Sequence, residues 1–304
     1  MTSLTSARPS STAPAVVALI GGALAMGMSP IAVRLADVGP FTSAFWRVAL
    51  ALPVLWLWVR VSEAGQPGRT RADGWSRPTL VAGLVFAADL FFWHLALVHT
   101  SVANATFFAT CAPLWVVVFG WLLFRERVGR ATIAGLGLCI GGGAALVWQS
   151  LRLAPGHVTG DVLGIVTGVF FGLYFLAVRA ARGGGVTAAR VTFEMSVIAA
   201  ALLFLTAVTL EHQLLPRGIN GWAALLGLSL VSHAGGQGLL SYALGILPAV
   251  FSSLVIFLEA IAAALAALLI LSEPLSGLQM AGGLLIIVGI WIARPRRADP
   301  ALEI

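Results

Sequence analysis

The fold of this 304-residue chain is decided by a motif that occurs twice, as Phe-Arg-Glu-Arg-Val at residues 124–128 and as Leu-Ser-Glu-Pro-Leu at residues 271–275. Pairing the glutamates of the two copies, without a gap, also pairs the glycines that follow them: Gly135 with Gly282, and Gly142 with Gly289. Self-similarity at a fixed spacing marks a repeated structural unit. The sequence therefore predicts two copies of one module.

The composition around these motifs is that of a membrane protein. Hydrophobic residues make up 59% of the chain and charged residues only 10%, and the mean hydropathy is +0.98. A soluble domain carries about a quarter charged residues, and a chain this apolar could not cover its own surface with polar groups. The composition excludes an ordinary soluble enzyme. The two cysteines, Cys111 and Cys139, lie in apolar runs and indicate no disulfide framework.

Ten stretches are long and apolar enough to cross a bilayer as helices, which takes about 20 residues each. They run over residues 15–36, 41–61, 78–98, 102–124, 131–148, 161–178, 187–209, 221–242, 248–271 and 276–293. Residues 1–14, rich in Ser, Thr and Pro, are predicted to form a disordered cytoplasmic tail. Residues 295–304 are predicted to form a cytoplasmic tail at the other end. The predicted fold is all-α, with ten transmembrane helices.

The arginines predict how these helices are oriented. All basic residues are arginine; with the N-terminus in the cytoplasm, 14 fall on the inner side and 3 on the outer side, while Arg47 lies within a span. This excess follows the positive-inside rule. We expect a multi-pass protein of the cell inner (plasma) membrane with both termini in the cytoplasm. No loop is large enough to dock a nucleic acid, so the bilayer itself is the expected partner.

The repeat and the helix count together predict inverted topology. Residues 15–150 and 158–294 each hold five spans, and because five is odd the second module must enter the membrane from the opposite side. In transporters built this way, the substrate binds near the bilayer midplane between the repeats, and access alternates by rocking. This is the first indication of function.

The chain resembles the drug/metabolite transporter superfamily, specifically its ten-helix EamA-type members. The matching residues are Ala44-Phe45-Trp46-Arg47, Ala112-Pro113, the two repeated motifs with Gly135 and Gly282, and Glu259 followed by Ala260. Ala260 departs from the family's Glu-Pro pair, so the resemblance does not by itself imply a helix break there. The resemblance implies an exporter of amino acids and related metabolites, and it suggests an aromatic amino acid exporter of the YddG type.

Two carboxylates lie near the middle of predicted spans. Each is a functional candidate by default, because an ionisable residue at membrane depth is costly. Asp89 shares a helix face with Phe86, Phe92 and Trp93, which suits a proton-titrating site, a partner for a substrate ammonium group, or a buried structural pair. Glu259 has small neighbours that fit close helix packing equally well.

The other polar candidates come from three further spans. Arg47 could hold a substrate carboxylate in a bidentate grip or extend to the outer surface, and the second interpretation is favoured. Ser229, His233, Gln237 and Ser241 recur every four residues and predict one polar wall of a cavity. His94 faces away from Asp89 on the same helix. Arg190 and Glu194 are spaced for an ion pair within one helix.

From these residues we predict a secondary transporter that exports small zwitterionic metabolites, with aromatic or other apolar amino acids favoured. The predicted substrate-binding residues are Arg47, Asp89, Trp93, His94, His233, Gln237 and Glu259. A multidrug or other organic-solute exporter of the same fold is the alternative. A carrier of phosphorylated compounds is disfavoured, because only Arg47 supplies a cation within a span. An intramembrane enzyme is disfavoured because no catalytic motif is present. No cofactor or metal is expected, and coupling to protons stays open.

Overall fold

The computed structural model describes residues 12–64, 75–152, 158–271 and 275–295. Within these ranges the chain is helical and no strand occurs. The helices are α1 (Thr12–Met26), α2 (Ser29–Leu35), α3 (Pro40–Ala49), α4 (Leu52–Ala64), α5 (Arg77–His99), α6 (Val102–Thr110), α7 (Ala112–Phe124), α8 (Arg130–Arg152), α9 (Val158–Gly183), α10 (Ala188–Leu210), α11 (Ile219–Gly227), the π-helix η1 (Leu228–Gln237), α12 (Gly238–Leu244), α13 (Ala249–Val255), α14 (Leu258–Leu271) and α15 (Gly277–Ala293). Of the predicted tails at 1–14 and 295–304, residues 1–11 and 296–304 lie outside the described residues, as does Glu273 of the second motif. Residues 12–14, which we expected in the first tail, form the start of α1 instead.

The predicted all-helical membrane fold is confirmed. In the described part of the chain, nine helical stretches are long and apolar enough to cross a membrane, from Thr12–Leu35 to Ala249–Ala266. The tenth predicted span corresponds to α15, an apolar helix of 17 residues. Hydropathy alone therefore located every span to within a few residues.

Several spans are interrupted near their middle, which hydropathy did not predict. The first breaks between α1 and α2, and the fourth at Cys111 between α6 and α7. In both, a proline occupies the first turn of the helix that follows, Pro30 in α2 and Pro113 in α7, where the missing N–H costs nothing. The ninth span also breaks, between α13 and α14, although Ala260 replaces the family's proline. There the amide of Glu259 bonds the carbonyl of Ile256 at 2.8 Å, a tightened turn with bonds three residues apart.

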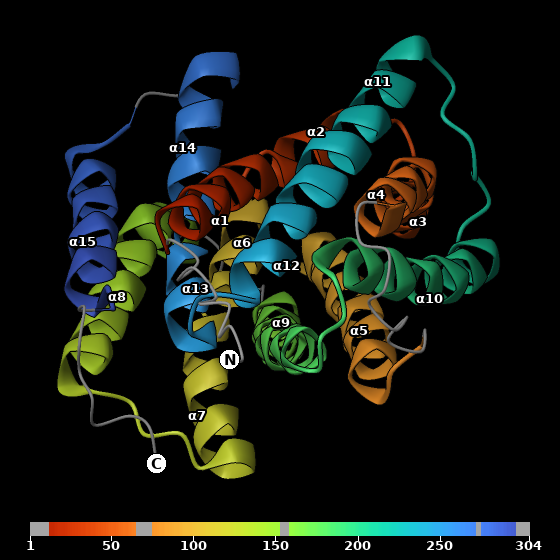
Figure 1. The fold of residues 1–304 in the computed structure, drawn as a ribbon. Coiled ribbons are helices and arrows are strands. Elements are labelled where there is room, and N and C mark those ends of the chain that lie inside the picture. Colours follow the sequence, from red (N-terminus) through yellow and green to blue (C-terminus); the bar gives the residue numbers. More distant parts are fainter. Residues whose placement is uncertain (1–11, 65–74, 153–157, 272–274, 296–304) are drawn as a thin grey trace, which may run out of the picture.

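The helices of the two repeats pack against each other. In Figure 1, α8 and α15 lie side by side at one edge, and α10 lies with α3, α4 and α5 at the opposite edge. Helix α9 runs between them against α5, α6 and α7. Glycines bring α8 and α15 into backbone contact, because a Cβ added at Gly142 would lie 2.4 Å from the carbonyl oxygen of Gly282.

Contacts between loops agree with inverted repeats. The carboxylate of Asp37, predicted on the outer side, accepts 3.0 Å hydrogen bonds from the amides of Arg217 and Gly218, also predicted outer. Glu126 and Arg179, both predicted inner, form a 2.8 Å ion pair. Each contact joins segments that the odd helix count assigns to the same face, as an inverted arrangement requires.

Candidate functional site

A cavity of about 50 Å³ lies where the broken first span meets helices of both repeats. Residues at the break between α1 and α2 contact it, together with side chains from α3, α5, α6, α9, η1 and α14. Its polar and aromatic lining includes Ser29, Arg47, Asp89, Trp93, Thr106, Thr167, Phe171, Gln237 and Glu259. Of the seven predicted binding residues, the cavity thus brings together five.

Three charged side chains from three helices line this cavity. Arg47 on α3 is only 5% exposed, and its Nε is buried without a hydrogen-bond partner. Asp89 on α5 is 7% exposed, and Oε1 of Glu259 on α14 is buried and unpartnered. Among the residues that the structure describes, these three charges form no ion pair with one another. The site therefore holds one guanidinium and two carboxylates whose hydrogen-bonding capacity is largely unused.

The favoured interpretation of Arg47, that it extends to the outer surface, is wrong. Its side chain lies in the cavity instead, because α3 packs along α10 and the first turn of α3 is closed over by the segment after α10. The carboxylate of Glu211 accepts hydrogen bonds of 2.8 and 2.9 Å from the amides of Phe41 and Thr42. The indole of Trp46 donates to the carbonyl of Leu214 at 2.7 Å. These contacts cover the end of α3 that is predicted to face outward.

The aromatic residues near Asp89 divide between two roles. Trp93 lines the cavity beside it. Phe86 is fully buried and packs instead against the rings of Tyr174 and His233, with centroids 5.1 and 5.4 Å away. Phe92 stacks on Phe170 at 5.4 Å. Only part of the predicted aromatic face is therefore available to a substrate.

The polar stripe of the eighth span is not a continuous cavity wall. Of its four members only Gln237 is among the residues that line the cavity. His233 bonds Ser196 on α10, with its Nε2 2.9 Å from the hydroxyl, and Ser229 and Ser241 are buried with unpartnered hydroxyls. Three of the four residues lie in the π-helix η1 and Ser241 lies in α12; their side chains are divided between the cavity and the neighbouring helices.

His94 also lies outside the described cavity lining. Its Nδ1 lies 2.7 Å from the carbonyl oxygen of Leu90, one turn earlier on α5, and its Nε2 is buried without a partner. Sequence reasoning correctly placed it on a different face from Asp89. Both histidines that we expected in the binding site are thus packed between helices.

Sequence reasoning missed the residues at the break of the first span and Tyr174. The signal for the first was present, since Gly27, Ser29 and Pro30 stand together in an otherwise apolar helix. A Cβ at Gly27 would lie 2.8 Å from the carbonyl oxygen of Glu259, so glycine permits the close approach of α1 and α14. Nothing in the sequence marked Tyr174, which lies behind the cavity wall.

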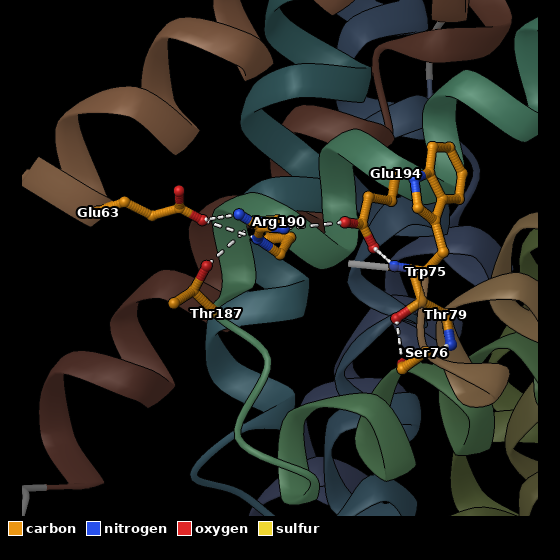
Figure 2. A network of polar contacts seen from close by, with 7 residues as sticks. All are labelled: Glu63, Trp75, Ser76, Thr79, Thr187, Arg190 and Glu194. Atoms are coloured by element: carbon orange, nitrogen blue, oxygen red, sulfur yellow. Dashed lines mark hydrogen bonds and ion pairs between the residues drawn. The ribbon is translucent and has the colours of Figure 1, made fainter. Parts of the chain in front are cut away.

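A second polar cluster ties the repeats together at the face predicted to be cytoplasmic (Figure 2). Arg190, at the start of α10, bridges Glu63 at 2.5 Å and Glu194 at 3.4 Å. Glu194 also accepts a 3.1 Å hydrogen bond from the amide of Trp75, which precedes α5. The predicted pair of Arg190 and Glu194 is confirmed, but the shorter contact is to Glu63 of the other repeat.

Comparison with known proteins identifies the family. A model of the EamA-like transporter family matches the chain twice, over residues 13–148 and 158–294. The chain belongs to the EamA-like transporter family. A crystal structure of a protein that is 20% identical to this EamA-like chain superposes with a TM-score of 0.79, covering 93% of this chain and 98% of that one. At that identity the likeness shows the fold alone.

Curated relatives of this EamA-like protein are transporters by name. It is 28% identical over 211 residues to the pseudopaline exporter CntI of Pseudomonas aeruginosa, covering 69% of this chain and 72% of that protein. It is 30% identical over 175 residues to an uncharacterized transporter of Helicobacter pylori, covering 54% of each. An uncharacterized transporter of Archaeoglobus fulgidus is 28% identical over 200 residues, covering 65% of this chain and 69% of that one. The protein is a multi-pass membrane transporter.

Proposed function

We propose that this transporter exports small zwitterionic metabolites, with aromatic or other apolar amino acids favoured, across the cell inner (plasma) membrane by alternating access. The observation that carries the proposal is the convergence of Arg47, Asp89 and Glu259 on one cavity between the repeats. The four other predicted binding residues are secondary to these three. The proposal includes no catalytic step and no cofactor.

A zwitterion that leaves water needs a partner for each of its charges. Arg47 can hold the carboxylate through two parallel hydrogen bonds, and Asp89 or Glu259 can receive the ammonium group. Trp93 and Phe171, which line the same cavity, offer apolar and aromatic surface to the substrate side chain. One site thus meets the three chemical needs of an apolar amino acid.

The cavity is too small for such a substrate in this conformation. Small-molecule sites usually enclose roughly 300–1,000 Å³, against about 50 Å³ here. Binding therefore requires the lining helices to move apart. The breaks in the first, fourth and ninth spans lie beside the cavity and allow half-helices to tilt separately, as alternating access requires.

Organic cations are the second candidate, because the cavity lining holds two carboxylates and one guanidinium. If both acids are ionised, the site is negative overall and favours a positively charged solute. Cation–π contact with Trp93 would add to this preference. The name of the relative CntI, an exporter of pseudopaline, supports export of an organic solute but fixes no substrate class for this chain.

Flux in proteoliposomes tests the proposal. Purified transporter is assayed with labelled phenylalanine, with lipophilic cations and with phosphorylated compounds, with and without a pH gradient. We expect phenylalanine flux that falls strongly in Asp89→Asn and Glu259→Gln. Matched controls are Asp161→Asn, which alters a carboxylate bonded to Thr100 at 2.8 Å away from the cavity lining, and Glu126→Gln at the inner face.

The outcomes separate the candidates. Cation flux without phenylalanine flux would contradict amino acid export and support the second candidate, export of organic cations. Phenylalanine flux that is unchanged in both cavity variants would remove the site assignment. A flux that responds to the pH gradient only while both acids are present would identify protons as the coupling ion.

The orientation is part of the proposal. We propose that both termini lie in the cytoplasm and that residues 15–150 and 158–294 are the two five-helix units. Tags at the two ends, tested for protease access in intact and opened cells, should be cleaved only after opening. Cleavage of one tag in intact cells would contradict the twofold arrangement.

A further inference from the structure

A buried tyrosine behind the cavity wall orients one of the residues that line it. The hydroxyl of Tyr174 on α9 donates a 2.9 Å hydrogen bond to Oε1 of Gln237 on η1. Tyr174 is fully buried, and Gln237 is 2% exposed where it lines the cavity. A phenol has one proton to donate and an amide has distinct donor and acceptor ends. This bond therefore decides which end of the Gln237 amide faces the cavity.

The phenol cannot readily swing away from that bond. Its ring is packed against Phe86 at 5.1 Å, Phe171 at 5.9 Å and Phe175 at 6.0 Å between centroids. A close-packed aromatic cluster of this kind restricts side-chain rotation. The carbonyl end of Gln237 is thus committed to Tyr174, and its NH₂ group has no hydrogen-bond partner among the described residues.

We infer that Tyr174 is a positioning residue that turns the NH₂ group of Gln237 toward the cavity, where it donates to the carboxylate of the substrate together with Arg47. The inference rests on the proposed function, since it completes the carboxylate end of the proposed zwitterion site. A carboxylate has about four acceptor positions on its two oxygens, so it can accept from a guanidinium and an amide together. An amine that lacks the carboxylate gains nothing from this donor.

The consequence is selectivity for an amino acid over the corresponding amine. The test uses the full-length transporter in liposomes with labelled phenylalanine and labelled phenethylamine, which differ by the carboxylate. The quantity measured is the ratio of the two kcat/KM values. Variants are Tyr174→Phe, which frees the amide to rotate, and Gln237→Glu, which replaces the donor with a negative acceptor. The control is Tyr242→Phe, at the other tyrosine of the chain, which is 37% exposed on α12.

We expect the phenylalanine-to-phenethylamine ratio to fall about tenfold or more in Tyr174→Phe, the scale of one lost hydrogen bond to a charged group. Gln237→Glu should lower it further, and Tyr242→Phe should leave it unchanged. If Tyr174→Phe does not reach the membrane, the test rests on Gln237→Glu, in which an unchanged phenylalanine-to-phenethylamine ratio would overturn the inference.

Equal losses of both fluxes would mean that Tyr174 only supports packing, and would overturn the inference. A higher ratio would mean that the carbonyl oxygen of Gln237 faces the cavity, and would overturn it as well. If the unmodified transporter moves phenylalanine but the ratio is the same in both variants, the inference fails while the proposed function stands. If it moves neither compound, the proposed function fails and the inference falls with it.

Discussion

The glycine contact between α8 and α15 yields the sharpest stability prediction, because two adjacent glycines have opposite surroundings. A Cβ at Gly142 would lie 2.4 Å from the carbonyl oxygen of Gly282, about 1 Å short of the 3.4 Å at which ordinary contact begins. The obstacle is backbone, which cannot rotate away. At Gly141, nothing lies within 4 Å of the same added atom.

Gly142→Ala must therefore push the two helices apart. Overpacking of this kind costs about 1–3 kcal/mol, and in membranes close contact between small residues is a main source of helix association. Gly141→Ala meets no obstacle, and alanine is favoured over glycine in a helix by up to about 1 kcal/mol. We expect the first variant to be destabilised and the second to be neutral or stabilised.

The assay is the free energy of unfolding of the reconstituted protein, measured by steric trapping in bicelles for the two variants in parallel. The two positions are adjacent in α8, but Gly141 is exposed and Gly142 is buried against α15, so a difference in stability reports on the α8–α15 contact. Equal stability of the two variants would refute the close backbone approach of α8 and α15, and with it the spatial contact between Gly142 and Gly282. Gly282→Ala, whose Cβ would lie 2.5 Å from the carbonyl oxygen of Gly142, should reproduce the loss.

Three further predictions concern two ion pairs, the glycine at the break of the first span, and the cap of α3. Arg190→Gln should lower the free energy of unfolding by about 1–3 kcal/mol, because it leaves a buried carboxylate without its cation. Arg179→Gln should cost less than about 1 kcal/mol, because the side chains of its ion pair are 38% and 33% exposed. Similar losses for the two variants in denaturant titrations would contradict this. Gly27→Ala should reduce transport roughly ten- to hundredfold in the flux assay, because the added Cβ displaces Glu259. Gly21→Ala is the control and should transport normally, since the nearest atom to its Cβ lies at 3.7 Å. Glu211→Gln should destabilise the protein by about 0.5–2 kcal/mol, since the carboxylate caps the first turn of α3, and unchanged thermal unfolding would argue against that cap.

The sequence predicted the candidate site less completely than the fold. Asp89, Glu259 and Gln237 were found because polar groups at membrane depth stand out against an apolar background, and all three line the cavity. Arg47 was found as a candidate, but its direction was predicted wrongly. A long side chain near a helix end can reach either the surface or the interior, and only the packing of α3 against α10 decides between them.

The four-residue spacing in the eighth span misled for a different reason. Such a spacing predicts which side chains lie on one side of a helix, but not which neighbouring helix or cavity each of them meets. His233 bonds Ser196 on α10 instead of facing the cavity. Tyr174 could not have been singled out at all, because the role we infer for it depends on its hydrogen bond to Gln237, 63 positions later in the chain.

By itself, the sequence determined which segments enter the membrane, that they form two related units of opposite topology, and which ionisable groups are carried into lipid. These are properties of composition and spacing, and the bilayer enforces them, because every apolar stretch of sufficient length must form a helix there. The tertiary structure alone decided which of those groups meet. Helix rotation, tilt and local breaks are set by packing against distant segments, and the cavity that joins Arg47, Asp89 and Glu259 is a product of that packing.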